Sequence, residues 1–150
     1  MFNNAAGKLV GHPMPMVPGE RTQTTMSPLV VIDRSSNDPY LVIGASGGLR
    51  IITSVAYVAS RILFKGNLAD EAVDKARLHF DPLDGRFHYE KGVSAKLLDF
   101  LKNNGFPKQE IDHFNHWSTR SVVQVVQKLP NNSYLAVSDV RKQGGYPAGF

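Results

Sequence analysis

Residues 40–50 read YLVIGASGGLR, and this stretch decides the fold. Its apolar beginning, residues 40–43, predicts a β-strand, which the glycine-rich residues 44–48 bring to an end. A helix is predicted over 49–64, because apolar residues there recur at helical spacing: Ile51, Ile52, Val55, Val58, Ala59 and Ile62. Several of these are β-branched and have low helix propensity, so packing must stabilise the helix.

Strand patterns lie on both sides of this stretch. Residues 29–33 predict a strand that forms a hairpin with 40–43 across a turn-rich loop, and 122–127 with 134–137 predict a second hairpin. A further strand is predicted at 86–90 from its alternating pattern.

Two more helices are predicted between the hairpins. The first spans 68–78 with Asn67 as its N-cap, and the second spans 94–104 with Ser94 as its N-cap and Gly105 as a left-handed stop. Hairpins mixed with helices, and no βαβ repeat, predict an α+β fold.

Composition sets broad limits on the protein. The chain has 150 residues, 42% hydrophobic and 20% charged, which predicts one globular core. We expect an irregular Pro/Gly-rich segment over 1–28 and a single α+β domain over 29–150. The absence of cysteine excludes disulfides, thiolate metal sites and cysteine nucleophiles. The sequence contains no run of about 18 apolar residues, so no membrane segment is predicted, and the amino-terminal residues do not resemble a signal peptide.

The glycine turn is the most informative local feature for function. A glycine-rich turn before a helix exposes backbone N–H groups at the positive helix end, which suits an anion or a developing oxyanion. A plain tight turn, in which Gly47 and Gly48 only relieve backbone strain, is the alternative. The hydroxyls of Thr24 and Thr25 could donate hydrogen bonds to a carboxylate, or could serve the start of a strand.

Other polar residues give weaker signals. His113 and His116 form the only close histidine pair, and without a third ligand they predict no metal site. The carboxylates near His79 and His88 (Asp81, Asp84 and Glu90) are interpreted as solvated loop groups. Residues 131–133, Asn-Asn-Ser, form an N-glycosylation sequon on a predicted turn, although such triplets also arise by chance.

An ordered set of short motifs carries a family resemblance. They lie at 18–21 (PGER), 24–28 (TTMSP), 44–53 (GASGGLRIIT), 76–79 (ARLH) and in the tail, with SDVRK at 138–142 and PAGF at 147–150. This set, over about 18–150, resembles the small catalytic subunit of the γ-glutamyltransferases, also called glutathione hydrolases. The resemblance implies the αββα sandwich of the N-terminal nucleophile hydrolases, in truncated form, and an enzyme family that hydrolyses glutathione or transfers its γ-glutamyl group.

The resemblance also implies roles for particular residues. The amides of Gly47 and Gly48 would form the oxyanion hole, and Thr24, Thr25 and Met26 would belong to the segment that binds the substrate α-carboxylate. The substrates implied are glutathione and other γ-glutamyl compounds. No cofactor or metal is implied, a large subunit is the implied partner, and relatives mostly act outside the cytoplasm or at the cell surface.

The chain departs from the family pattern in two places. The family's threonine nucleophile would lie before Met1, so we expect no turnover by this polypeptide alone. Where the family usually has acidic residues that hold the substrate amine, residues 5–8 read AAGK. We therefore keep two rival hypotheses: a non-catalytic interaction protein that retains the light-chain fold, and a basic module that binds anions or nucleic acid. The second has little support, because the basic residues do not alternate with aromatic ones.

Overall fold

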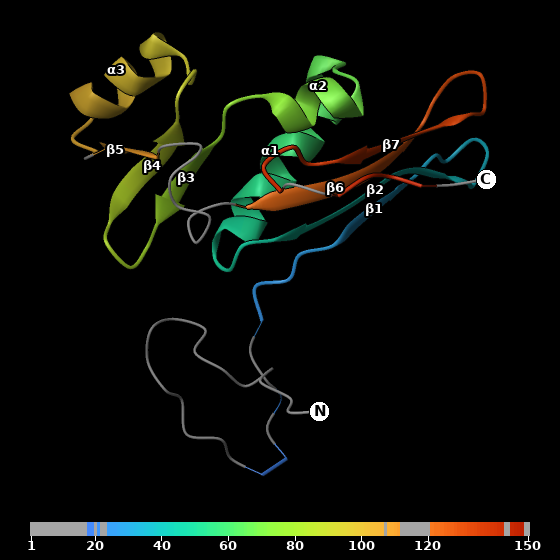
Figure 1. The fold of residues 1–150 in the computed structure, drawn as a ribbon, viewed down its shortest axis with the longest axis horizontal. Helices are drawn as coiled ribbons and strands as arrows, with labels where there is room; N and C mark the ends of the chain where they lie inside the picture. The colour runs from blue at the N-terminus through green and yellow to red at the C-terminus, as the bar shows by residue number, and fades with distance from the viewer. Residues whose placement is uncertain are drawn as a thin grey trace.

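The computed structural model describes residues 18–19, 21, 24–106, 108–111, 121–142 and 145–148. They form two sheets with helices against them (Figure 1). The larger sheet has the strand order β1-β2-β6-β7, and every neighbouring pair in it is antiparallel. Its strands are β1 (Leu29–Ile32), β2 (Pro39–Ser46), β6 (Val122–Lys128) and β7 (Tyr134–Ser138).

The core lies between this sheet and two helices on one of its faces, α1 (Arg50–Lys65) and α2 (Ala69–Asp74) (Figure 1). Alternate residues of the central strands point into it, and Leu41 and Val123 are completely buried. The helix α1 contributes Val55, Val58 and Ile62 from one face. Burial of this helical stripe compensates for the low helix propensity of its β-branched residues.

The smaller sheet lies beside the amino-terminal half of α1 and has the order β3-β4-β5. It is formed by β3 (Leu78–Asp81), β4 (Arg86–Glu90) and β5 (Lys108–Ile111), with α3 (Ala95–Asn103) preceding β5. The pair β3/β4 is antiparallel, whereas β4 and β5 are parallel.

Most predicted elements are confirmed. Both hairpins, the strand at 86–90, the helix after the glycine turn and the helix at 94–104 are present within a residue or a few of their predicted bounds. Gly105 follows α3 with φ 77°, the left-handed conformation predicted for its stop. Within the segment predicted to be irregular, the described residues 18–19, 21 and 24–28 contain no helix or strand.

Other predictions were wrong. The helix predicted over 68–78 ends at Asp74, because Lys75 takes an extended conformation and the chain enters β3, which the periodicity did not reveal. Asn67 is not its N-cap, since its amide donates to the Glu71 carboxylate (2.9 Å) and Leu68 takes the cap position. The predicted N-cap position of Ser94 on α3 is confirmed, although its side chain makes no cap hydrogen bond. The strand β5 was also missed.

The register of β2 gives a direct test of the core. Leu41→Ala is expected to destabilise the fold by about 2–5 kcal/mol, because Leu41 is fully buried and the cavity would refill only partly. The neighbouring Val42 points to the other face and is 41% exposed, so Val42→Ala should cost less than about 1 kcal/mol. Urea denaturation midpoints of the two variants measure the difference. A lower midpoint for Val42→Ala than for Leu41→Ala would mean that the register is shifted by one residue, and equal midpoints would contradict the burial of Leu41.

Candidate functional site

The glycine turn joins β2 to α1 and presents backbone amides to the outside. Gly47 and Gly48 have φ of 128° and 60°, which glycine adopts without a Cβ clash. The first turn of α1 uses their carbonyls, since the N–H of Arg50 donates to Gly47 O (3.2 Å) and that of Ile51 to Gly48 O (3.1 Å). The Gly48 N–H belongs to the same peptide as the Gly47 carbonyl, and in a trans peptide the N–H points opposite to the C=O. Because the Gly47 carbonyl points toward the helix, the Gly48 N–H points away from it.

The Gly47 amide is oriented by a residue that sequence reasoning did not single out. The buried hydroxyl of Ser121 donates to Ser46 O at 2.9 Å, and this carbonyl shares its peptide plane with the Gly47 N–H. The Gly47 amide therefore points away from Ser121. Within the described part of the chain, neither glycine N–H has a hydrogen-bond acceptor. Among the described residues, no group therefore competes with an anion for these two N–H groups.

The structure brings the predicted threonine segment to this turn. The hydroxyl of Thr25 donates to Gly48 O at 2.9 Å, although the two residues are 23 positions apart. Thr24 Oγ1 accepts from the Met26 N–H at 3.1 Å, and its own proton is free to donate within the described part of the chain. The Met26 side chain is exposed. Met26 instead contributes through its backbone N–H, which donates to the Thr24 hydroxyl and orients it. Thr24 is thus better placed than Thr25 to donate to a carboxylate.

Behind the turn lies a buried ionic cluster, which we define as Arg77, Glu90, Asp139 and Arg141. Arg77 donates to the Asp139 carboxylate (2.6 Å) and to Ser121 O (2.9 Å). Arg141 donates to Asp139 (3.1 Å) and pairs with both carboxylate oxygens of Glu90. The motifs at 76–79 and 138–142 therefore meet in space, and through Ser121 their cluster reaches the glycine turn.

Asp139 is fully buried at the centre of this cluster. Burial alone would raise the pKa of Asp139, but the charge of Arg77 and hydrogen bonds from the backbone amides of Arg141 and Val123 lower it below its ordinary value. The carboxylate is therefore charged, and it neutralises part of the positive charge of the two arginines. The interpretation of Glu90 as a solvated loop carboxylate was wrong, because it closes this cluster.

A histidine lies beside the first turn of α1. His79 is buried, and its Nδ1 is 2.8 Å from Thr53 Oγ1, whose proton is donated to Arg50 O (3.2 Å). Burial and the positive charge of Arg50 lower the pKa of His79, so it is neutral near pH 7. His88 instead contacts Asp84 at 2.7 Å. The two histidines therefore have separate partners and form no shared acid–base pair.

No group of three metal-binding side chains occurs among the described residues. His113 and His116 lie outside them. Nor is any described helix long and apolar enough to cross a bilayer.

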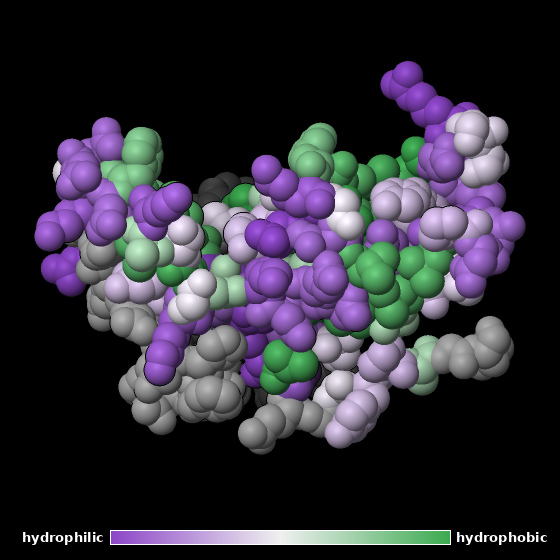
Figure 2. All heavy atoms as spheres, turned by 90° about the horizontal axis from the view of Figure 1, so that it is seen from above, coloured by the Kyte–Doolittle hydropathy of each residue, from purple (hydrophilic) through white to green (hydrophobic). Residues whose placement is uncertain are grey.

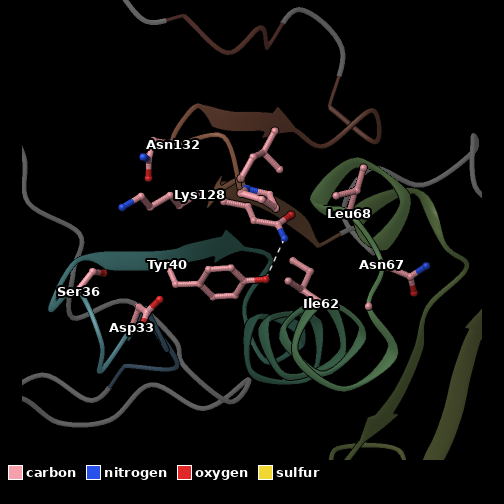
Figure 3. Close-up of a pocket in the computed structure, with 12 residues that line it drawn as sticks. Asp33, Ser36, Tyr40, Ile62, Asn67, Leu68, Lys128 and Asn132 are labelled. Atoms are coloured by element: carbon pink, nitrogen blue, oxygen red, sulfur yellow. Dashed lines mark hydrogen bonds between the residues drawn. The ribbon is translucent and has the colours of Figure 1, made fainter.

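A pocket of about 420 Å³ lies at the other end of α1, between its C-cap Gly66, the β1–β2 turn and the β6–β7 turn. In Figure 3 the Tyr40 ring extends across it toward Ile62, and the Gln127 amide donates to the Tyr40 hydroxyl at 3.1 Å. The 16 residues of α1 separate this pocket from the glycine turn by roughly 24 Å. It is thus no part of the same site.

Comparison with known proteins identifies the family. Residues 2–149 match the sequence pattern of the family described as Gamma-glutamyltranspeptidase. The chain belongs to the gamma-glutamyltranspeptidase family. It is 33% identical to human glutathione hydrolase 5 proenzyme over 92% of its own length and 22% of that protein. It is 32% identical to scoloptoxin SSD20 of Scolopendra dehaani, over 90% of this chain and 65% of that one.

Solved structures agree with this assignment. A mutant gamma-glutamyltranspeptidase from Helicobacter pylori superposes with a TM-score of 0.73 and 29% identity, over 85% of this chain and 66% of that one. The predicted α+β fold of the N-terminal nucleophile hydrolase type is confirmed. The chain spans 21% of the length of scoloptoxin SSD14, so it corresponds to part of a typical family member.

Proposed function

We propose that this chain provides the oxyanion hole and part of the α-carboxylate subsite of a γ-glutamyl-transferring or γ-glutamyl-hydrolysing enzyme. The hydrogen bond from Thr25 to Gly48 carries the proposal, because it unites the two segments that the family resemblance assigns to substrate. When a nucleophile attacks the γ-glutamyl carbonyl, its oxygen becomes negatively charged, and the outward amides of Gly47 and Gly48 stabilise that charge.

The hydroxyls of Thr24 and Thr25 have different roles in this proposal. The Thr24 hydroxyl donates to the substrate α-carboxylate, while Thr25 holds the Gly48 carbonyl, which belongs to the peptide between Gly48 and Leu49, and so ties the threonine segment to the turn. The attacking threonine and the rest of the substrate site come from outside these 150 residues. The chain alone therefore binds γ-glutamyl compounds weakly and does not turn them over.

A partner is proposed for the outer sheet face, which we define as Val30, Val42, Val126 and Ala136. These residues are paired in register across β1, β2, β6 and β7, on the face opposite to α1. Val30, Val42 and Val126 are 56%, 41% and 40% exposed. Seen from above, the surface of the molecule carries groups of apolar side chains among hydrophilic ones (Figure 2). A row of three valines and one alanine fits a second sheet packed face to face.

The same outer face would serve a non-catalytic interaction protein, which is the alternative function. The two hypotheses differ at the glycine turn. A partner-bound complex that forms normally but shows no γ-glutamyl binding would favour the interaction protein.

Binding by the isolated chain tests the proposed subsite. We expect L-glutamate to shift the ¹⁵N–¹H resonances of Gly47 and Gly48 saturably, and γ-aminobutyrate, which lacks the α-carboxylate, to shift them much less. Thr24→Ala should weaken binding roughly 10- to 150-fold, because one hydrogen bond to a charged group is lost, whereas Thr24→Ser should retain it. Equal shifts with both ligands, or no effect of Thr24→Ala, would contradict the proposed carboxylate contact.

A further inference from the structure

The β6–β7 turn, residues 129–133, protrudes from the end of the larger sheet. It is closed by backbone hydrogen bonds from Leu129 N to Ser133 O (2.8 Å) and from Asn132 N to Leu129 O (3.0 Å). Asn132 adopts φ 62°, which asparagine tolerates better than most residues. The turn is therefore well defined, and residues 131–133 are all exposed.

The side chain of Asn131 is held in a fixed orientation within this turn. Its Oδ1 accepts from both the backbone N–H of Ser133 (3.1 Å) and the Ser133 hydroxyl (2.6 Å). The amide nitrogen Nδ2 has no partner among the described residues. Asn131 thus presents a free carboxamide nitrogen to solvent, with the hydroxyl two residues later touching the same carboxamide.

We propose that Asn131 is the attachment site of an asparagine-linked glycan. Residues 131–133 are the only Asn-x-Ser/Thr triplet with x other than proline in the whole sequence. The donor is a lipid-diphosphate-linked oligosaccharide. A bond forms between Nδ2 and the anomeric carbon, the glycosyl–phosphate bond breaks, the diphosphate leaves with the electron pair, and the amide nitrogen loses one proton.

The position of the turn makes a glycan compatible with the fold. Asn132 and Pro130 line the pocket at this end of α1, so the glycan would stand beside that pocket (Figure 3) and about one helix length from the glycine turn. It would not cover Gly47 or Gly48. It also constrains the proposed partner, which must cover the outer sheet face while leaving the β6–β7 turn in solvent.

The experiment directs the full chain into the secretory pathway of a eukaryotic cell with a cleavable leader and measures intact mass before and after peptide-N-glycosidase treatment. We expect a heterogeneous added mass that the glycosidase removes, with Asn131 converted to Asp. Asn131→Gln and Ser133→Ala should each abolish the added mass completely. Ser133→Thr should retain it.

Asn132→Gly is the matched control, because it keeps both the triplet and the positive φ without a Cβ. It should carry the glycan at wild-type occupancy. Circular dichroism of the secreted Ser133→Ala and Asn132→Gly proteins verifies that both are folded. A wild-type chain without glycosidase-sensitive mass, or added mass that persists in Asn131→Gln, overturns the proposal.

Discussion

Asp139→Asn is expected to destabilise the folded protein by about 3–5 kcal/mol, because it leaves Arg77 and Arg141 buried beside each other without the central carboxylate. Asparagine preserves the size of the side chain, so the loss is electrostatic rather than a packing defect. Urea denaturation at pH 7 measures it. Asp99→Asn, at an exposed position on α3, is the matched control and should change stability by less than about 0.5 kcal/mol.

The same carboxylate predicts how stability depends on pH. The pKa of Asp139 is lower in the folded chain than its ordinary value of 3.8. Its contribution is therefore complete above the unfolded pKa and is lost as the pH falls through the folded pKa. Below about pH 4 the wild type and Asp139→Asn should converge in stability. A constant difference between them down to pH 2 would mean that Asp139 does not act through its charge.

A double-mutant cycle separates the ion pair from other effects. Arg77→Met removes the cation as well, so the double variant with Asp139→Asn should be more stable than the sum of the two single losses predicts. Strict additivity would show that the two side chains do not act as a pair.

Gly48→Val is expected to lower γ-glutamyl turnover by about 10²–10³-fold in an assembly that supplies the nucleophile, because one oxyanion donor is lost. Valine strongly disfavours the φ of 60° found at residue 48, so the peptide must rotate and its N–H must turn away. The assay is anilide release from a γ-glutamyl anilide. The assembly is a chimera in which this chain replaces the segment of the wild-type Helicobacter pylori gamma-glutamyltranspeptidase that superposes on it.

Gly44→Ala provides the control for this turn. Gly44 lies in β2 without a left-handed φ, and an added Cβ would meet no atom within 4 Å. This variant should retain nearly full turnover. Ser121→Ala should give an intermediate loss, because the Gly47 peptide is released from one restraint while both amides survive. Equal rates for Gly48→Val and Gly44→Ala would remove Gly48 from the catalytic proposal.

Local patterns predicted what depends on neighbours in sequence. The helix after the glycine turn, both hairpins and Gly105 follow from periodicity and turn chemistry, which act over a few residues. The strand β3 was missed because it has only four residues, Leu78–Asp81, and the first of them was assigned to the predicted helix over 68–78, although the Asp84-Gly85 turn was a signal for a hairpin with β4. So short a strand is defined by its pairing with β4 and not by its own pattern.

The candidate site depends more on contacts between distant segments than on local sequence patterns. Gly47, Gly48 and the threonines were found from the sequence, but the contact of Thr25 with Gly48 depends on how the segments fold back. Ser121 carried no signal, because an isolated serine before a strand is common. The ionic cluster could have been suspected from the charged pair Asp139 and Arg141, yet its partners lie on other elements.

The ionic cluster has a consequence for synthesis on the ribosome. Arg77 emerges 62 residues before Asp139, and Glu90 emerges 51 residues before Arg141. At cellular elongation rates of about 5–20 residues per second, Asp139 is synthesised roughly 3–12 s after Arg77. Until then the nascent chain cannot bury this cation, and β2 also lacks its neighbour β6. The described fold can therefore be completed only after Arg141 has been synthesised, when chaperones have had several seconds to bind the nascent chain.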